Sequence, residues 1–172
     1  MERRFRPGVI VGLTLIAIVL AVLIVRFTGG PAASTPTQTA VPAGTEAAVV
    51  DYVHDGDTLF LEDGRKVRLL GIDTPEIGDH AECYGDEAKA LLRTLLPKGT
   101  QVQVLADVQP LDRYGRSLLF IYTDDGTNIN LELIEAGAAE AVVLKPNVMF
   151  ASQLETAEDR AQAAGRGMWG QC

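Results

Sequence analysis

The fold is decided by residues 47–76, which read AAVVDYVHDGDTLFLEDGRKVRLLGIDTPE. The apolar residues come in short runs bounded by turn residues, a pattern typical of β-strands. Two of these runs are joined at Asp63-Gly64, a dipeptide that supplies the positive φ of a two-residue hairpin. The stretch therefore predicts three consecutive antiparallel strands, a meander, at the start of a folded domain.

The rest of the domain adds two strands and three helices. Helices are predicted over 84–96, 128–137 and 150–164, because apolar runs there end at glycine or proline. Residues 100–107 and 116–122 predict two further strands. Five strands, mostly early and antiparallel, together with three helices predict an α+β domain built on a small closed β-barrel.

Two segments of different composition precede this domain. Residues 27–46 are mainly Pro, Thr, Ala and Gly, which cannot bury a core, so they predict an extended linker to a domain over 47–172. Residues 8–25 form an uncharged run of 18 residues. As a helix this run would be about 27 Å long, just enough to cross a membrane. We therefore interpret residues 1–26 as a single N-terminal transmembrane signal anchor.

The flanking charges give this anchor an orientation. MERRFR before the apolar run holds three arginines, whereas the other flank holds one, so the amino end should stay cytoplasmic and the domain should lie outside. A cleaved signal peptide is the alternative, with residues 1 to about 34 removed and the domain secreted. The sequence thus predicts either membrane anchoring or secretion.

The charge distribution limits how the domain can bind nucleic acid. The net charge is −8, but residues 1–26 carry +3 and residues 27–172 carry −11. Proteins that bind nucleic acid through a broad positive field need many lysines and arginines to displace counterions from the phosphates. Any phosphate chemistry in this acidic domain must therefore come from a local site.

Charged residues gather in three places: Asp55-Gly56-Asp57-Thr58, Arg68 with Asp73-Thr74-Pro75-Glu76, and Asp112-Arg113-Tyr114-Gly115-Arg116. Each cluster has an ordinary structural explanation. The first is typical of a turn whose carboxylates bond their own backbone, the second of a strand end turned by proline or of a helix cap, and the third of a solvated hairpin. None of the three is decisive alone.

Strand alternation gives the two arginines more weight. With a strict period of two, Arg68 shares a face with Leu70 and Ile72, and Arg116 shares one with the apolar residues at 118, 120 and 122. A guanidinium on an apolar face must either reach solvent through its stem or meet a carboxylate or phosphate. Both possibilities stay open for each arginine.

The motifs taken together resemble those of a known family. DGDT, RLLGIDTPE, ECYGDEA, DRYGR, LKPN and GRGMWG follow one another over residues 48–170, in the order and approximate spacing of the staphylococcal nuclease (thermonuclease) family. The resemblance implies a five-stranded barrel of the oligonucleotide-binding (OB) type with a calcium-dependent phosphodiesterase site. Its substrates would be single-stranded DNA or RNA, its products 3′-phosphorylated, and the protein a monomer.

The resemblance also implies roles for single residues. Asp57, Asp73 and the Thr74 carbonyl match the family's metal ligands, and oxygen donors without His or Cys suit Ca²⁺. Glu76 matches the general base that deprotonates the attacking water. The arginines that would contact the scissile phosphate are Arg68 and Arg116, and the residues that would contact nucleotide at the rim are Arg113 and Tyr114.

This chain departs from the family pattern at the substrate-binding surface. Val142 and Leu144 stand where the best-known member has tyrosines that stack on the base, and residues 77–83 form a short acidic loop where that member is rich in lysine. Stacking contributes about 1–3 kcal/mol per base. These differences predict a weaker grip on polynucleotide and a strong demand for calcium.

The chain holds two cysteines and two histidines. If Cys83 and Cys172 pair, they form one disulfide that ties the end of the chain to the barrel; export favours this pairing, and two free thiols are the alternative. His54 and His80 lie near the acidic turns, do not match family ligands, and are interpreted as surface residues.

The sequence therefore predicts a calcium-dependent nuclease acting outside the cytoplasm. Two other functions are the alternatives: a catalytically silent barrel that only binds nucleic acid or protein, and a calcium-stabilised structural domain. A silent copy has no need of all five charged residues at once, and a structural domain needs neither arginine. The charged set, Asp57, Arg68, Asp73, Glu76 and Arg116, is complete.

Overall fold

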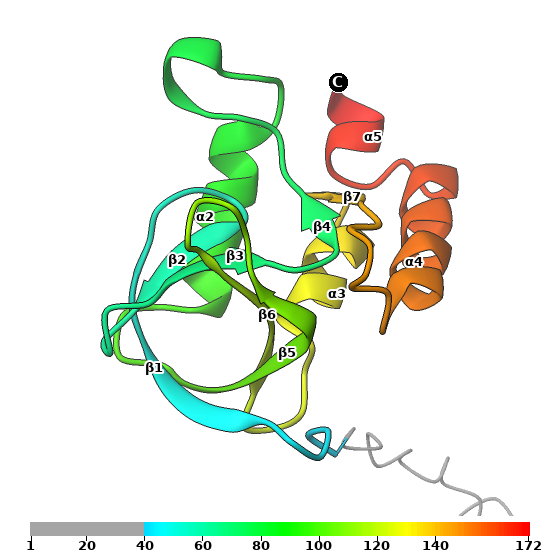
Figure 1. Cartoon of the computed structure of the whole chain (residues 1–172). Coiled ribbons are helices and arrows are strands. Elements are labelled where there is room, and N and C mark those ends of the chain that lie inside the picture. Colours follow the sequence, from blue (N-terminus) through cyan, green and yellow to red (C-terminus); the bar gives the residue numbers. More distant parts are fainter. Residues whose placement is uncertain (1–39) are drawn as a thin grey trace, which may run out of the picture. The chain divides into compact units, whose positions relative to one another are not determined.

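The structure is a computed structural model that describes residues 40–172, and these residues form a closed β-barrel with helices packed against it (Figure 1). The predicted anchor over 1–26 and most of the linker over 27–46 lie outside the described residues. Among residues 40–172, no helix combines the length and apolar character needed to cross a membrane.

Five strands make the barrel, in the order β1-β2-β3-β6-β5. The predicted meander is present as β1 (Glu46–Val53), β2 (Thr58–Leu61) and β3 (Lys66–Leu69), which pair antiparallel. The barrel is closed by β5 (Gln101–Leu111) and β6 (Ser117–Thr123). β5 pairs antiparallel with both β1 and β6, whereas β6 pairs parallel with β3. This confirms the prediction of a five-stranded barrel.

The turn between β2 and β3 differs from the prediction. Leu61 N donates a hydrogen bond to Arg65 O at 3.0 Å, so three residues, 62–64, form the loop in place of the predicted two. Gly64 has a φ of 90°. A glycine in the left-handed region at the last position is typical of three-residue hairpin loops, which explains why Asp63-Gly64 signalled a hairpin but not its length.

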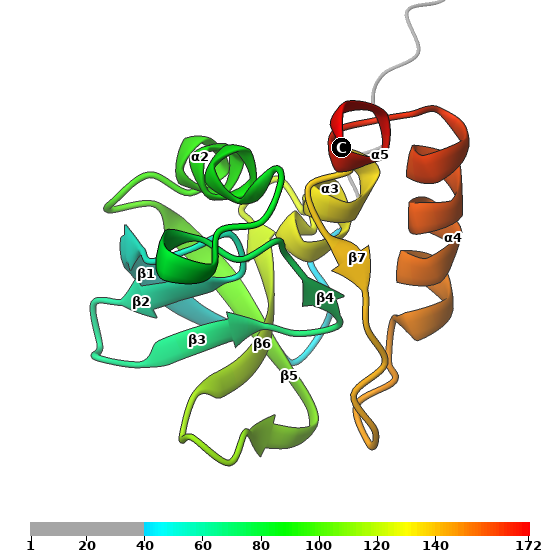
Figure 2. The ribbon, with the colours of Figure 1, turned by 90° about the horizontal axis from the view of Figure 1, so that it is seen from above.

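Three longer helices are present, close to their predicted bounds: α2 (Gly85–Leu95), α3 (Ile129–Glu135) and α4 (Ala151–Ala163). α3 follows β6 and lies between the barrel and α4 (Figure 2). The side chain of Asn128 caps α3 by accepting a hydrogen bond from Leu131 N. The agreement reflects the strong local signals at these helix ends.

Four short elements were not predicted. β4 (Ile72–Asp73) pairs with β7 (Glu140–Ala141) beside the barrel, η1 (Gly78–His80) is a single 3₁₀ turn, and α5 (Met168–Gln171) ends the chain. Elements of two to four residues carry too few side chains to show a period. The β4–β7 pair matters most, because it holds Asp73 beside the end of β3.

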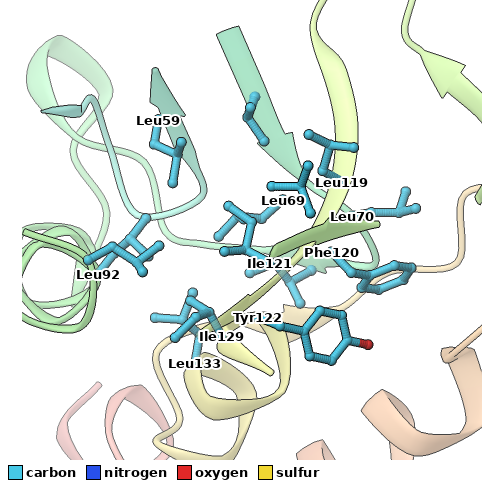
Figure 3. Close-up of a cluster of buried hydrophobic side chains, with 14 of the residues drawn as sticks. Leu59, Leu69, Leu70, Leu92, Leu119, Phe120, Ile121, Tyr122, Ile129 and Leu133 are labelled. Atoms are coloured by element: carbon cyan, nitrogen blue, oxygen red, sulfur yellow. The ribbon is translucent and has the colours of Figure 1, made fainter. Parts of the chain in front are cut away.

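The core fills the barrel and continues under the helices (Figure 3). Leu59, Leu69 and Ile121 point inward from the strands, and Leu92 and Leu133 join them from α2 and α3. All of these side chains are fully buried. Burial of this kind is the main favourable contribution to folding.

A buried amide ties α3 to the barrel where β3 ends. Asn130 is fully buried; its side chain accepts a hydrogen bond from Ile121 N at 3.0 Å and donates to Leu70 O at 2.9 Å. Satisfied buried amides hold a backbone in one arrangement, because breaking them leaves polar groups unpaired. Asn130 therefore supports the segment that leads from β3 to Asp73.

A disulfide joins Cys83, just before α2, to Cys172 at the end of the chain. The two cysteines are 89 residues apart in sequence. On the chain-entropy model, closing a loop of this length contributes about 4.5 kcal/mol to stability. The bond ties α5 to the loop that carries Glu76.

Candidate active site

Arg68 projects from β3 on the side opposite to the core. Its neighbours Val67 and Leu69 are fully buried, whereas the Arg68 side chain faces outward and is 11% exposed. The prediction that Arg68 shares an apolar face with Leu70 and Ile72 is wrong, because β3 ends at Leu69 and the chain then turns. Both of those residues are buried on the core side of that turn.

The Arg68 guanidinium holds two carboxylates together. Its Nη2 lies 2.9 Å from Asp57 Oδ2 and 2.5 Å from Asp73 Oδ1. Its Nη1 donates hydrogen bonds to the carbonyl oxygens of Leu69 at 2.7 Å and Ile72 at 2.6 Å. The turn that follows β3 therefore fixes this arginine. Of the two possibilities given by the sequence, reaching solvent or meeting an anionic group, Arg68 follows the second and meets carboxylates.

Asp57 is the buried member of this pair, with 7% of its surface exposed. Thr58 donates its hydroxyl to Asp57 Oδ1 at 2.9 Å, and Thr74 N lies 3.4 Å from Oδ2. Burial raises the pKa of Asp57 to about 6, although the Arg68 charge opposes this rise. The positive charge of Arg68 therefore compensates only part of the cost of burying the Asp57 carboxylate.

The turn before Asp57 serves both as a turn and as part of the site. Asp55 Oδ1 accepts a hydrogen bond from Asp57 N at 3.2 Å, which is the ordinary turn explanation. A Cβ at Gly56 would lie 2.5 Å from Thr74 Oγ1. Glycine is therefore needed here for the Asp55–Asp57 turn to pack against the segment that carries Asp73.

Glu76 is positioned by residues that the sequence analysis did not single out. Glu76 N donates to Glu82 Oε2 at 3.0 Å, and Glu82 N donates to Glu76 O at 2.9 Å. A Cβ at Gly85 would lie 2.4 Å from Glu76 O. Glu82 and Gly85 both belong to the ECYGDEA motif. The motif indicated the family, but the sequence did not reveal that these two residues position Glu76. Among the contacts of residues 40–172, none engages the Glu76 carboxylate, which is exposed.

Arg116 is held by Asp112 on the loop between β5 and β6. Arg116 Nε donates to Asp112 Oδ2 at 2.7 Å, and the backbone N–H groups of Tyr114 and Arg116 donate to Oδ1, both at 2.9 Å. The predicted apolar face for Arg116 is not distinct, because residues 117–122 are buried on both sides of β6. The guanidinium is instead partly exposed beside Arg68 in the cleft described next.

The six residues with predicted catalytic or metal roles line one cleft of about 200 Å³: Asp57, Arg68, Asp73, Thr74, Glu76 and Arg116. A neighbouring cleft of about 470 Å³ shares Arg68, Asp73 and Arg116 with the first. Its walls include Arg113 and Tyr114, together with the aliphatic side chains at 142 and 144. The structure therefore brings together residues from four separate parts of the chain.

Arg113 and Tyr114 lie at the outer edge of the larger cleft. Tyr114 is 69% exposed, and Arg113 Nη2 donates a hydrogen bond to its hydroxyl at 2.6 Å. The guanidinium of Arg113 also lies 4.7 Å from the centre of the Tyr114 ring. His54 and His80 are exposed, as predicted, and neither lines the two clefts.

Comparison with known proteins places this arrangement in a family. The family model described as "Staphylococcal nuclease homologue" matches residues 66–171. A thermonuclease of Staphylococcus intermedius is 31% identical over 92% of this chain and 95% of that protein. The chain belongs to the staphylococcal nuclease family. A thermonuclease of Staphylococcus hyicus is 30% identical over the same shares of the two chains.

The relatives also include larger members of the staphylococcal nuclease family. Endonuclease YhcR of Bacillus subtilis is 30% identical over 73% of this chain, which spans 12% of that protein. The resemblance inferred from the motifs is therefore confirmed. Membership among named nucleases supports a nuclease, and hence a hydrolase, function for this chain.

The donor set of this staphylococcal nuclease homologue fits a hard cation. Asp57 and Asp73 bring carboxylates to the smaller cleft, Thr74 lines it beside them, and Arg68 uses one oxygen of each carboxylate. Oxygen ligands without nitrogen or sulfur suit Ca²⁺, which completes its shell with water. Within residues 40–172, no group of three or more His, Cys, Asp or Glu side chains is gathered as a metal site.

Replacing Asp57 with asparagine is expected to stabilise the nuclease when metal is absent. The folded state favours protonated Asp57, because its pKa is raised from 3.8 to about 6. The stability linked to that proton is present below the unfolded pKa and is lost as the pH rises through about 6. With EDTA at pH 7, the substitution should therefore raise the free energy of unfolding by about 1–3 kcal/mol.

Urea unfolding in EDTA checks this expectation. The gain of Asp57→Asn over the wild type should shrink at pH 4, where the wild-type carboxyl is mostly protonated. Asp159→Asn removes an exposed carboxylate of α4 and should change stability little at either pH. A metal-free Asp57→Asn protein less stable than the wild type at pH 7 would contradict the electrostatic account of the site.

Proposed function

We propose that this protein is a calcium-dependent nuclease that hydrolyses phosphodiester bonds of single-stranded DNA or RNA outside the cytoplasm. The observation that carries the proposal is the cleft in which two arginines, two carboxylates around one of them, and the unengaged Glu76 carboxylate meet. Phosphoryl chemistry needs these parts: cationic donors for the phosphate, a cation site, and a base for the water.

Arg68 and Arg116 are the donors for the scissile phosphate. Both line the smaller cleft, and each is held from one side by carboxylates, Arg68 by Asp57 and Asp73 and Arg116 by Asp112. Arg116 bonds Asp112 through Nε and so keeps its terminal N–H groups for phosphate oxygens, whereas Arg68 already uses Nη1 and Nη2 and offers its remaining Nε–H. They neutralise the charge that develops on the equatorial oxygens of the transition state.

Glu76 takes the proton of the attacking water. The water oxygen forms the new P–O bond while the P–O5′ bond breaks, and the departing O5′ takes up a proton from solvent, which leaves a 3′-phosphate and a 5′-hydroxyl. Asp57, Asp73 and the Thr74 carbonyl would hold Ca²⁺. When bound, this ion acts as a Lewis acid on a phosphate oxygen and offsets the negative charge around the substrate.

Three properties of the chain support the remaining parts of the proposal. The −11 charge of residues 27–172 opposes a polyanion, so a strong demand for Ca²⁺ is expected. The Cys83–Cys172 disulfide fits an oxidising compartment, since such bonds rarely persist in the cytosol. The apolar run over 8–25 with its arginine-rich flank fits an anchor or an export signal, and we propose a monomer that is membrane-anchored or secreted.

A cleavage assay with the full-length chain in mild detergent tests this function. Single-stranded DNA, single-stranded RNA and duplex DNA would each be incubated with millimolar Ca²⁺, with Mg²⁺, or with EGTA. We expect cleavage of the single strands with Ca²⁺, none with EGTA, and 3′-phosphate ends on the products. Equal cleavage in EGTA would exclude the calcium mechanism, and intact oligonucleotides in Ca²⁺ would favour a silent binding barrel.

A further inference from the structure

A cluster of aromatic and cationic side chains lies on the outer surface of β1, β2 and β3. Tyr52 and Phe60 stack with ring centres 4.6 Å apart and an angle of 11° between their planes. His54 meets Phe60 edge-on at 6.2 Å, and Lys66 Nζ lies 5.6 Å from the centre of the Phe60 ring. We call these four residues the aromatic patch.

The aromatic patch is open to solvent and is not part of the core. Tyr52 is 45% exposed and His54 is exposed, whereas the alternate residues Leu59 and Leu61 of β2 point into the barrel. No ion pair engages Lys66 among the described residues, 40–172. The patch therefore presents ring faces and an available positive charge to a ligand.

Strand register places the patch next to the cleft that holds Arg68. Tyr52 pairs with Phe60 across β1 and β2, and Phe60 pairs with Lys66 across β2 and β3. Thr58 pairs with Arg68 in the same register, so the patch and Arg68 lie on one face of the sheet, two residues apart along β2 and β3. Lys66 is therefore about 7 Å from Arg68 along β3, and Tyr52 lies two strands away from β3, about 10 Å across the sheet, so a nucleotide that adjoins a phosphate at Arg68 can reach the patch.

The aromatic patch also supplies a stacked pair of rings, which the described residues of the larger cleft do not contain. In that cleft the positions expected to stack on a base hold Val142 and Leu144, and Tyr114 is engaged by Arg113 at its rim. An aromatic surface beside a cation suits nucleobases, because every base has a π face and its backbone is anionic. In this chain, the stacked aromatic pair lies on β1 and β2.

We propose that Tyr52 and Phe60, with Lys66, form a subsite that stacks the nucleobase adjoining the scissile phosphate, on the flank of the active site formed by β1–β3. The inference rests on the proposed nuclease function and adds where a single strand is held. It predicts a preference for substrates with an unpaired base at that position, because a base paired in a duplex cannot reach the ring face. Lys66 would pair with the phosphate of the same nucleotide.

The test combines base deletion with ring deletion. The probes are thymidine hexanucleotides that contain one phosphodiester among methylphosphonate linkages, either intact or with an abasic residue on one side or the other of the cleavable bond. Full-length Tyr52→Ala should raise KM for the intact probe by about 5- to 100-fold, the value of one stacked base, and change kcat little. On the probe that is abasic at the stacked position, the same substitution should have almost no effect.

Several controls separate stacking from a structural role. Tyr52→Trp keeps a ring and should retain wild-type KM, whereas Tyr52→Leu fills the space without a ring and should behave like Tyr52→Ala. Val148→Ala trims another exposed apolar residue, which lines neither cleft and should change nothing. Circular dichroism melting of each variant shows whether the barrel is intact.

The outcomes distinguish this inference from the proposed function. If the wild type cleaves the probes with Ca²⁺ but Tyr52→Ala has an unchanged KM, or raises KM equally on intact and abasic probes, the subsite is wrong and the nuclease stands. If the wild type cleaves neither the probes nor any longer single-stranded substrate, both the proposed function and the subsite are overturned.

Discussion

Glu76→Gln is expected to fold normally and to lose about 10²- to 10⁴-fold in kcat, the usual contribution of a general base. Glutamine keeps the length of the side chain but cannot accept a proton from water. The fold should not suffer, because the Glu76 side chain is exposed and the contacts that position the residue come from its backbone, through Glu82. The measurement is the steady-state rate on a single-stranded oligonucleotide in saturating Ca²⁺.

A matched substitution and a binding measurement sharpen the Glu76 result. Glu155→Gln removes an exposed carboxylate from α4 and should leave kcat unchanged. The Ca²⁺ concentration for half-maximal substrate binding should be the same in Glu76→Gln as in the wild type, because Glu76 is not among the proposed ligands. A Glu76→Gln protein with more than a third of wild-type kcat would remove Glu76 from the mechanism and leave the family membership untouched.

The parts of the fold that could be predicted are those set by local sequence. The meander of β1, β2 and β3 follows from short apolar runs and a glycine turn, and α2 ends where Pro97 and Gly99 stop it. The parallel pairing of β3 with β6 could not be predicted in this way. It joins Arg68 to Leu118, and no local pattern records which distant strand will close a barrel.

The failure of alternation around Arg68 has a similar cause. Strict period-two counting assumes that a strand continues, but β3 ends at Leu69, and Leu70 and Ile72 are buried beyond its end. The same turn offers the carbonyl groups that fix the guanidinium. The turn that defeats the simple prediction is thus the feature that positions a residue of the site.

The members of the candidate site were predictable because the charged motifs occur in a recognisable order. What could not be predicted is how they are held. Glu82 and Gly85 position Glu76 through contacts across a loop, and Tyr52 with Phe60 resembles ordinary strand composition until the register pairs them. A residue that acts through backbone contact or through a cross-strand partner leaves no pattern of its own along the chain.

Substituting either arginine of the cleft should slow cleavage, because both are proposed to bind the phosphate, but the two substitutions should lower the free energy of unfolding by different amounts. Arg116→Ala should lower kcat/KM by about 10²- to 10³-fold, as for the loss of one preorganised donor to the transition state. Its partner Asp112 has a side chain that is 15% exposed and keeps two backbone N–H donors, so the free energy of unfolding should fall by only about 1–2 kcal/mol. Arg116→Lys keeps the charge but not the fork of donors, and should recover only part of the rate.

Arg68→Ala should combine a similar loss of rate with a loss of stability. Asp57 is 7% exposed and lies 2.9 Å from the Arg68 guanidinium. Without that partner, Asp57 either stays charged in a buried position or takes up a proton, because its pKa of about 6 rises further, and two backbone carbonyls lose their donor. Because proton uptake limits the electrostatic cost, the loss of stability should be about 2–4 kcal/mol. Urea unfolding in EDTA at pH 7 should therefore separate the two arginine variants clearly.

Arg65 provides the matched control for both arginine substitutions. It stands directly before β3 and pairs with Asp63 and Glu46, yet it lines neither cleft. Arg65→Ala should leave kcat/KM unchanged, because it removes one arginine outside the clefts and so changes the net charge of the domain without changing the site. If Arg65→Ala slowed cleavage as much as Arg116→Ala, the arginines would act through the overall field of an acidic domain, and the local phosphate site proposed here would be wrong.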